Sequence, residues 1–185
     1  MVKIVFIDGP DVSGKTTLVK KLLDNPDFNF KELVFDKGLG GLLRINKEEQ
    51  FEILRSLLPN LNPVYIYIMD RCYLSNMVYD GISGEDIEPS LEFRDWCKDY
   101  VDSIEIMLDR PYIKTDFEDD LVTIDKITFN EIIDEYRILG SVDIINNPEL
   151  EEEIFDMLYK WQYQGENRQS CLEVWHMDER EEITW

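Results

Sequence analysis

Five short apolar runs alternate along the chain with longer segments whose apolar residues recur at helical spacing. The runs cover residues 2–7, 31–35, 64–69, 103–108 and 142–145. The first and third runs are apolar almost throughout, which is typical of strands covered on both faces. Repeated alternation of strand and helix predicts an α/β fold, with a central parallel sheet of about five strands and helices on both faces.

The segments between these runs have the spacing of amphipathic helices. Helices are predicted to begin just after Gly14, near Asn46, and at residues 73, 88, 124 and 149. Aromatic side chains form a stripe along residues 88–100, which we interpret as part of the core. In the helix over 124–139, the positions predicted to face inward are Ile127, Ile132, Ile133, Tyr136 and Leu139.

A glycine-rich segment joins the first strand to the first helix. Gly9-Pro10-Asp11-Val12-Ser13-Gly14-Lys15-Thr16 fits the pattern G-x-x-x-x-G-K-[ST] at every fixed position. The two glycines allow successive N–H groups to face inward, and the helix adds the positive end of its dipole. Lys15 is expected to reach the β- and γ-phosphates, and the Thr16 hydroxyl to bind Mg²⁺. The sequence thus predicts an ATP site whose phosphate-binding residues are Gly9, Asp11, Val12, Ser13, Gly14, Lys15, Thr16 and Thr17.

Asp70 and Arg71 directly follow the third strand. A carboxylate at the end of a central strand near a phosphate loop is where nucleotide kinases and ATPases hold Mg²⁺, so Asp70 is a second predicted metal ligand. The planar guanidinium of Arg71 suits bidentate recognition of a phosphate. The alternative interpretation of this dipeptide is a surface ion pair at the end of a strand.

Two other strand exits carry basic residues. Lys37 lies in a loop with three glycines after the second strand; the glycines alone fit a ligand site and a flexible turn equally, and Lys37 favours a phosphate contact. Arg110 and Lys114 are the cations that follow the fourth strand, and the next residues are polar and acidic. We therefore predict a mobile lid over about residues 109–120.

Charge and cysteine content narrow the choice of partners and location. The chain has 185 residues and a net charge of −21, from 19 basic and 40 acidic side chains. Such a field repels nucleic acids and anionic membranes, so small-molecule nucleotides are the expected partners. The cysteines, Cys72, Cys97 and Cys171, are far apart and odd in number, which favours the reducing cytoplasm over a disulfide scaffold. We expect no leader and no membrane span, and His176 is interpreted as a structural or surface residue.

Three motifs resemble those of the thymidylate kinase family. The phosphate loop reads FIDGPDVSGKTT, the exit of the third strand reads DRCYLSNMVY, and Phe51-Glu52-Ile53-Leu54-Arg55 gives a Phe-x-x-x-Arg helix before that strand. The resemblance covers about residues 2–147. It implies a P-loop kinase fold that transfers the γ-phosphate of ATP to a pyrimidine deoxynucleoside monophosphate, with dTMP as the expected acceptor and Mg²⁺ as cofactor.

The resemblance implies roles for the residues beside the phosphates. Asp11 would accept a hydrogen bond from the 3′-hydroxyl of the acceptor, Arg71 would bind its phosphate, and Asp70 would act through Mg²⁺. The residues expected to be catalytic are Lys15, Asp11, Arg71 and Arg110.

On the acceptor side, the resemblance implies that Phe51 lies against the pyrimidine ring and that Arg55 donates to its O4. Asn76 would reach the edge of the base, and Tyr79 would stand near the sugar. With Asp11 and Arg71, and with Lys37 as a substitute for the family's Arg-x-Pro-Gly, these residues complete the predicted acceptor site.

The chain departs from the family pattern at the donor side. Val12 stands where one family branch has an arginine, and the lid has Arg110 and Lys114 where another branch has a catalytic arginine. We expect residues 1–163 to form the kinase domain. Residues 164–185 would form an acidic, Trp-containing extension that packs on the domain or on the partner subunit of a homodimer.

Two other functions remain open. A deoxynucleoside kinase shares the fold and needs a base for a 5′-hydroxyl, which Asp36 could supply. A non-catalytic nucleotide-binding regulator, with the acidic tail engaging a partner, would account for the departures in the lid.

Overall fold

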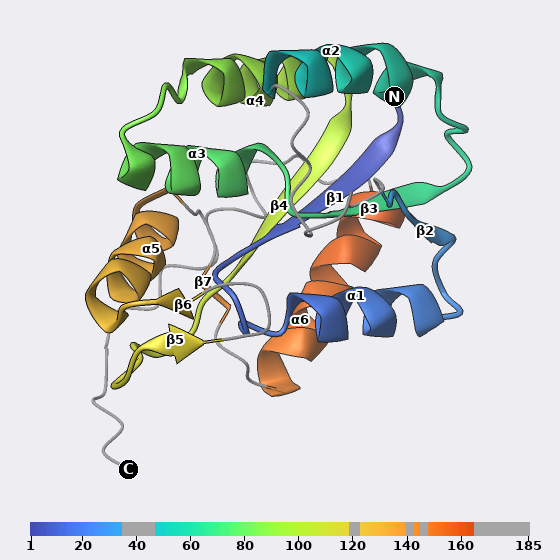
Figure 1. Ribbon diagram of the computed structural model, residues 1–185. Helices are drawn as coiled ribbons and strands as arrows, with labels where there is room; N and C mark the ends of the chain where they lie inside the picture. Colours follow the sequence, from blue (N-terminus) through green and yellow to red (C-terminus); the bar gives the residue numbers. More distant parts are fainter. Residues whose placement is uncertain (35–46, 119–122, 140–142, 145–147, 165–185) are drawn as a thin grey trace. The chain divides into compact units, whose positions relative to one another are not determined.

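A five-stranded parallel sheet organises the first part of the chain in this computed structural model (Figure 1). Its strands are β1 (Lys3–Asp8), β2 (Phe30–Glu32), β3 (Ile66–Asp70), β4 (Asp102–Leu108) and β7 (Asp143–Ile144). The order across the sheet is β2-β3-β1-β4-β7. The predicted number of strands and their parallel direction are therefore confirmed, and β1 lies in the middle.

The structure describes residues 1–34, 47–118, 123–139, 143–144 and 148–164. The chain divides into two compact units, Met1–Asn146 and Asn147–Trp185. The last predicted helix belongs to the second unit, whereas the sequence analysis grouped it with the first 163 residues.

Helices cover both faces of the sheet, as predicted (Figure 1). One face carries α1 (Lys15–Asp24), and the other carries α2 (Lys47–Leu57), α3 (Tyr73–Ser83) and α4 (Glu88–Tyr100). A short 3₁₀ turn, Leu58–Asn60, follows α2, and α5 (Lys126–Leu139) packs beside α3.

The alternation of side chains along β1 explains why both faces must be covered. Ile4 and Phe6 belong to the apolar cluster under α2, α3 and α4. Val5 and Ile7 are equally buried and, because side chains alternate along a strand, point to the opposite face. A strand apolar on both faces can only be central.

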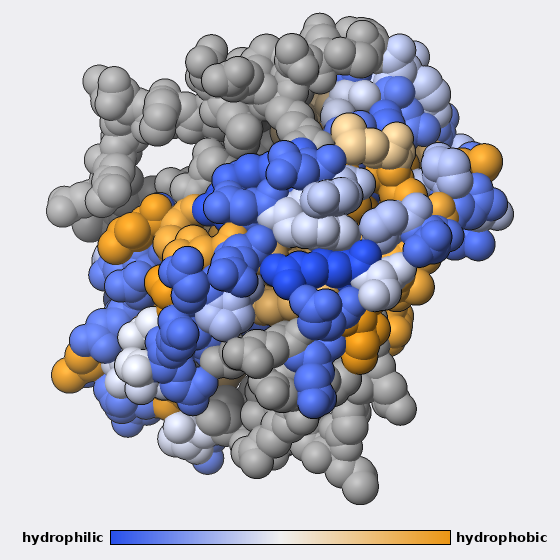
Figure 2. All heavy atoms as spheres, turned by 90° about the horizontal axis from the view of Figure 1, so that it is seen from above, coloured by the Kyte–Doolittle hydropathy of each residue, from blue (hydrophilic) through white to orange (hydrophobic). Residues whose placement is uncertain are grey.

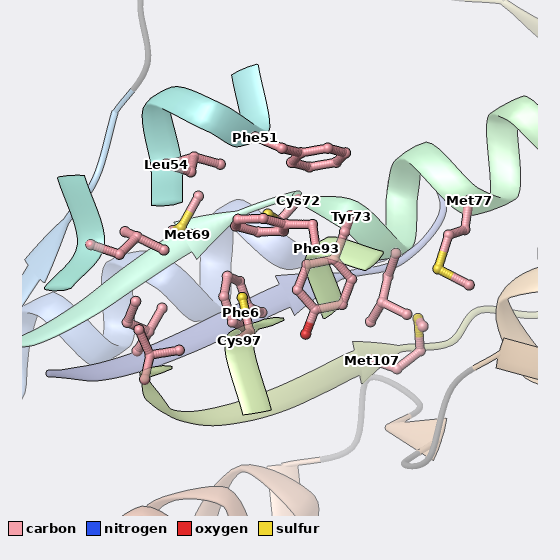
Figure 3. Close-up of a cluster of buried hydrophobic side chains, with 14 of the residues drawn as sticks. Phe6, Phe51, Leu54, Met69, Cys72, Tyr73, Met77, Phe93, Cys97 and Met107 are labelled. Atoms are coloured by element: carbon pink, nitrogen blue, oxygen red, sulfur yellow. The ribbon is translucent and has the colours of Figure 1, made fainter. Parts of the chain in front are cut away.

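The main apolar cluster fills the space between the sheet and α2, α3 and α4 (Figure 3). The aromatic stripe of α4 takes part in it: the ring of Phe93 stacks on Phe51 at 4.5 Å and on Trp96 at 5.6 Å. Trp96 in turn stacks on Tyr100 at 5.0 Å, and Tyr100 is exposed. The prediction that this stripe is core holds at Phe93, and the stripe continues outward to the surface.

Helix α5 buries most of the residues predicted to face inward. Ile132, Ile133 and Tyr136 are buried, whereas Ile127 is 65% exposed, so the prediction for Ile127 was wrong. Ile127 lies in the first turn of the helix, where its backbone N–H donates to the capping carboxylate of Asp125 at 3.0 Å. The start of the helix is thus fixed by a polar cap and not by burial of that side chain.

A small antiparallel hairpin begins within the region predicted as a lid and ends just after it. It consists of β5 (Phe117–Glu118) and β6 (Thr123–Ile124). The ring of Phe117 packs against Phe129 of α5 with centroids 4.7 Å apart. The sequence analysis predicted a mobile segment here and did not anticipate strands.

The described part of the second unit is helical. It comprises α6 (Pro148–Tyr159) and a π-helical turn, Lys160–Gln164, in which Lys160 pairs with Asp156 at 2.7 Å. The predicted extension after Gln164 lies outside the described residues. Among the described residues, every helix is too short or too polar to cross a membrane. In the view from above, hydrophilic side chains cover much of the described surface and apolar ones appear as separate spots (Figure 2).

Candidate functional site

The phosphate loop has backbone angles that require glycine at two positions. Gly9 has φ +145°, and a Cβ there would lie 2.4 Å from the carbonyl oxygen of Leu108 at the end of β4. Gly14 has φ +94° and forms the N-cap of α1. The loop therefore packs directly on the neighbouring strand, and a side chain at Gly9 would push it away.

Lys15 is buried, and its side chain contacts the backbone of this loop. Its ammonium group donates to the carbonyl oxygens of Gly9 at 2.9 Å and Pro10 at 2.6 Å, and lies 3.4 Å from the Ser13 hydroxyl. These acceptors hold the lysine against the loop that the sequence predicts to bind phosphate.

The surroundings of Lys15 lower its pKa to about 8. Burial is the main cause and the nearby guanidinium of Arg71 adds to it, while three carboxylates act in the opposite direction: Asp11, Asp70 and Asp8. A phosphate would favour the charged form of this lysine, because it would add negative charge beside a cation that burial disfavours.

Arg71 and Tyr79 converge on the side chain of Asp11. The Arg71 guanidinium forms an ion pair with one carboxylate oxygen of Asp11, and the other oxygen lies 3.4 Å from the Tyr79 hydroxyl. Arg71 also donates to that hydroxyl at 3.2 Å. Burial would lower the pKa of Arg71, but Tyr136, Tyr79 and Asp11 together raise it above the ordinary value. The structure thus brings together three residues that the sequence predicted for the acceptor site.

The backbone at Arg71 adopts an unusual conformation. Its φ is +67°, in the left-handed region that residues with a side chain seldom adopt. The N–H of Arg71 donates to the carbonyl oxygen of Ile7 at 2.9 Å, which ties the exit of β3 to the end of β1.

Arg110 approaches the same loop from the other side of β1. Its guanidinium donates to the backbone carbonyl of Asp11 at 2.8 Å and lies over the ring of Phe129 at 5.2 Å. Burial lowers the pKa of Arg110, and the Asp11 carboxylate opposes that shift. Two arginines, one after β3 and one after β4, therefore contact the same residue of the phosphate loop.

The carboxylates that precede these arginines differ in their partners. Oδ1 of Asp70 is buried and has no hydrogen-bond partner among the described residues. Asp109 is buried and is paired with Arg137 at 2.9 Å. An unpartnered carboxylate oxygen at the end of β3 is a chemically suitable ligand for Mg²⁺, together with the hydroxyl of Thr16. Within the described residues, no three acidic, histidine or cysteine side chains cluster as a complete metal site, and Mg²⁺ usually needs only one or two protein ligands besides phosphates.

The sequence analysis missed Asp8, the last residue of β1. Its buried Oδ1 accepts hydrogen bonds from the backbone N–H groups of Cys72 at 3.2 Å and Ser75 at 3.0 Å, and from the Ser75 hydroxyl. Tyr136 of α5 donates to the same hydroxyl at 2.8 Å. Burial raises the pKa of Asp8, although these donors oppose the shift. Asp8, at the end of β1, thus caps the start of helix α3. Its position directly before Gly9 of the phosphate loop was the signal that could have identified it.

The contacts described for two of the predicted base-binding residues, Phe51 and Arg55, are with the core and with α2 itself. Phe51 is only 1% exposed and one face of its ring stacks on Phe93 (Figure 3). The Arg55 guanidinium donates to Glu52 at 2.6 Å. Lys37 lies outside the described residues. Contacts of Phe51 and Arg55 with a base therefore remain predictions.

The remaining predicted residues lie on the first turns of two helices. Thr16 and Thr17 are exposed at the start of α1, next to Gly14. Asn76 is half-buried on α3, three residues before Tyr79, so both lie on one side of that helix.

Comparisons with known proteins support the fold. No protein-family model matches the chain, and no curated protein matches it. Among solved structures, the YorR protein of Bacillus subtilis in complex with phosphorylated GDP is similar, with a TM-score of 0.55 and 18% identity over 87% of this chain and 98% of that one. Thymidylate kinase from Ehrlichia chaffeensis matches with a TM-score of 0.49 and 15% identity over 85% of this chain and 98% of that one. The likeness to the first of these structures supports an α/β fold with a central parallel sheet.

Proposed function

We propose that this protein is a nucleoside monophosphate kinase that transfers the γ-phosphoryl group of ATP to a pyrimidine deoxynucleotide, with dTMP as the preferred acceptor. The observation that carries the proposal is the convergence of Arg71 and Arg110 on Asp11 of the phosphate loop. Two cations beside a phosphate loop suit a reaction in which phosphates from two nucleotides must approach each other.

The proposed chemistry needs positioning and charge neutralisation but no general base, because the acceptor phosphate oxygen is already ionised. Lys15 would neutralise the β- and γ-phosphates of ATP. Arg71 would bind the acceptor phosphate, and Arg110 would stabilise the charge on the transferring group. Mg²⁺, held by Thr16 and Asp70, would supply further neutralisation of the ATP phosphates when bound.

The acceptor is proposed from the family resemblance and from Asp11 and Tyr79. A carboxylate beside a tyrosine suits the 3′-hydroxyl and sugar of a deoxynucleotide, because the ring leaves little room for a 2′-hydroxyl. Phe51 and Arg55 would then read the base. Thymine and uracil present an acceptor at O4, whereas cytosine presents an amino donor there. A site built around that hydrogen bond can reject the wrong base by roughly 10⁴-fold or more.

A coupled kinase assay tests the proposal directly. The unmutated protein is supplied with ATP·Mg²⁺ and, in turn, with dTMP, dUMP, dCMP, dGMP and the matching nucleosides. Turnover of dTMP and dUMP with strong rejection of dCMP is expected. The substitution Lys15→Ala should abolish turnover of every acceptor. Faster turnover of nucleosides would indicate a deoxynucleoside kinase. Preference for dGMP would indicate a guanine nucleotide as the acceptor; the similar YorR structure contains phosphorylated GDP. ATP binding without any turnover would support a regulator.

Two properties of the whole protein are proposed from sequence alone. We expect a homodimer, by resemblance to the family, and a cytoplasmic location, by cysteine content. Sedimentation velocity at micromolar concentration tests the first, and fractionation of the source cells tests the second.

A further inference from the structure

Helix α5 presents a polar stripe to the chain that leaves β4. The stripe consists of Asn130, Asp134 and Arg137, which are spaced at i, i+4 and i+7 and therefore lie on one side of the helix. Each of the three contacts a residue between Asp109 and Ile113. This segment begins the region that the sequence predicted to be a mobile lid.

Arg137 makes the central contacts of the stripe. Its Nε lies 3.0 Å from both carboxylate oxygens of Asp109, and its terminal nitrogen donates to the Arg110 carbonyl at 3.0 Å. Its guanidinium also lies over the ring of Tyr112 at 4.7 Å. One side chain thus holds the carboxylate before Arg110, the backbone of Arg110 and the ring after it.

The other two residues hold the next turn of the chain. The Asn130 side chain accepts from the N–H of Ile113 at 2.9 Å and donates to its carbonyl at 3.2 Å, so it pairs with that backbone as a strand would. The Tyr112 hydroxyl donates to Asp134. The start of the predicted lid is therefore held against α5 by hydrogen bonds.

This arrangement controls where the Arg110 guanidinium can go. Asp109 is its direct neighbour in sequence, and Oδ1 of Asp109 accepts a hydrogen bond from the backbone N–H of Arg110 at 2.7 Å. Arg137 contacts both oxygens of Asp109, while the Arg110 guanidinium lies over Phe129 and donates to the phosphate loop. A buried carboxylate left without its partner would compete strongly for any nearby cation.

We propose that Arg137 is a positioning residue: by pairing with Asp109, it directs Arg110 to the phosphate loop. The effect on catalysis rests on the proposed kinase function. The placement of Arg110 does not, since it depends only on the pairing within this chain.

The test uses three variants of the full chain: Arg137→Gln, Asp109→Asn and the double substitution. In Arg137→Gln the Asp109 carboxylate should capture Arg110, and kcat should fall by about 10- to 100-fold with little change in acceptor KM. The double variant has no carboxylate to capture Arg110, so its kcat should recover to within a few-fold of the unmutated protein. A double variant as slow as Arg137→Gln would overturn the proposal.

Arg94 provides a matched control, because it pairs with a carboxylate on β4, the strand that Asp109 follows. From helix α4 it pairs with both carboxylate oxygens of Glu105, through Nε at 3.1 Å and a terminal nitrogen at 2.6 Å. The two arginines are equally exposed, at 24% for Arg94 and 23% for Arg137. Arg94→Gln should lower the melting temperature about as much as Arg137→Gln and leave kcat unchanged. An equal fall of kcat in both would show a general structural effect and contradict the proposal.

A readout without turnover separates this inference from the proposed function. The ¹⁵N–¹H resonance of the Arg110 Nε group can be assigned by its loss in Arg110→Lys. It should move in Arg137→Gln and return toward its original position in the double variant. If the resonance stays in place in Arg137→Gln, the proposal fails even for an active enzyme. If it moves while no nucleotide is turned over, the kinase proposal fails alone.

Discussion

The same dipeptide, Asp-Arg, occurs at the exit of each of the two strands that flank β1, and its aspartate has different partners at the two places. Asp70 ends β3 and Arg71 follows it, and Asp109-Arg110 directly follows β4. Both arginines reach Asp11, one at its carboxylate and the other at its carbonyl. The two aspartates differ: Asp70 has a buried oxygen without a partner among the described residues, whereas both oxygens of Asp109 contact Arg137.

The difference teaches that the partners of a residue, and not its type or its place at a strand end, decide what it is available to do. An unpaired carboxylate oxygen in a low-dielectric site is costly unless a ligand uses it. A paired one is already satisfied and contributes to the structure. On this basis we propose Asp70 as a ligand for Mg²⁺, and the pair of Asp109 with Arg137 as the contact that keeps Arg110 at the phosphate loop.

Exchanging each aspartate for asparagine gives the largest contrast between the two dipeptides. Asp70→Asn should lower kcat by about 10²-fold or more, because it removes a metal ligand and its charge, with little change in stability. Asp109→Asn should cost about 1–3 kcal/mol of unfolding free energy, because it breaks the pair with Arg137, and should leave kcat within a few-fold. Urea unfolding and steady-state kinetics on both variants check this, and a complete loss of turnover in Asp109→Asn would contradict it.

Truncating each arginine sharpens the comparison at the level of the two substrates. Arg71→Ala should weaken binding of the monophosphate by about 10²-fold and leave ATP binding nearly unchanged, because only the acceptor phosphate meets that guanidinium. Arg110→Ala should lower kcat by about 10²-fold with a smaller effect on acceptor binding. Calorimetry with each nucleotide separates the two. Equal loss of both nucleotides in Arg71→Ala would move that arginine to the donor site.

Lys15 is close to Asp70 and Arg71, and its charge should destabilise the folded chain at neutral pH. Its pKa is about 8 in the folded protein and 10.5 ordinarily, so between these values the unfolded chain binds a proton that the folded chain has lost. The unfavourable contribution of Lys15 to the unfolding free energy therefore decreases as the pH increases from 8 to 10.5, and the folded chain becomes more stable. The gain in unfolding free energy from Lys15→Met should shrink by roughly 2–3 kcal/mol between pH 7 and pH 10. Chemical denaturation at both pH values measures it, and a constant difference would refute the shifted pKa.

Val12 offers the smallest expected effect and tests the loop that both arginines share. It has φ +58° and is 72% exposed, so its branched side chain gains little from burial and strains the backbone. Val12→Gly should raise the unfolding free energy by about 0.5–1 kcal/mol, because the relief of strain exceeds the added flexibility of the unfolded chain. Val12→Ala, which keeps a Cβ, is the control and should gain less. Thermal unfolding decides, and no gain in Val12→Gly would show that the conformation carries no strain.

The middle of the sheet was predictable because β1 and β3 are apolar enough to show as separate runs, whereas β2, Phe30–Glu32, carries two charged residues and only overlaps the start of the run predicted over 31–35. The β5–β6 hairpin was not predictable, since two-residue strands are too short to reveal alternation and Glu118 lies in an acidic stretch. Pairing across the hairpin and the packing of Phe117 on Phe129 stabilise it instead. Those contacts cannot be derived from local periodicity.

The site was predictable where a motif fixed the residues and not where pairing fixed them. Asp11, Arg71 and Arg110 stand at recognisable positions, and the structure brings them together. Arg137 lies in a polar stripe of a helix, a pattern that ordinarily faces solvent, and its partner Asp109 is 28 residues away in sequence. Phe51 illustrates the same limit, because sequence does not distinguish a ring stacked in the core from a ring that faces a ligand.

The position of β1 in the middle of the sheet has a consequence for how the protein is made. Asp11 emerges from the ribosome early, but Arg71 follows 60 residues later and Arg110 follows 99 residues later. The loop also needs the end of β4, on which Gly9 packs. Contacts so distant in sequence form late in folding, because the intervening chain must be ordered first. A nascent chain shorter than about 110 residues therefore carries the complete phosphate-loop motif without the partners that shape it, and nucleotide capture should begin only after β4 has left the ribosome and joined the sheet.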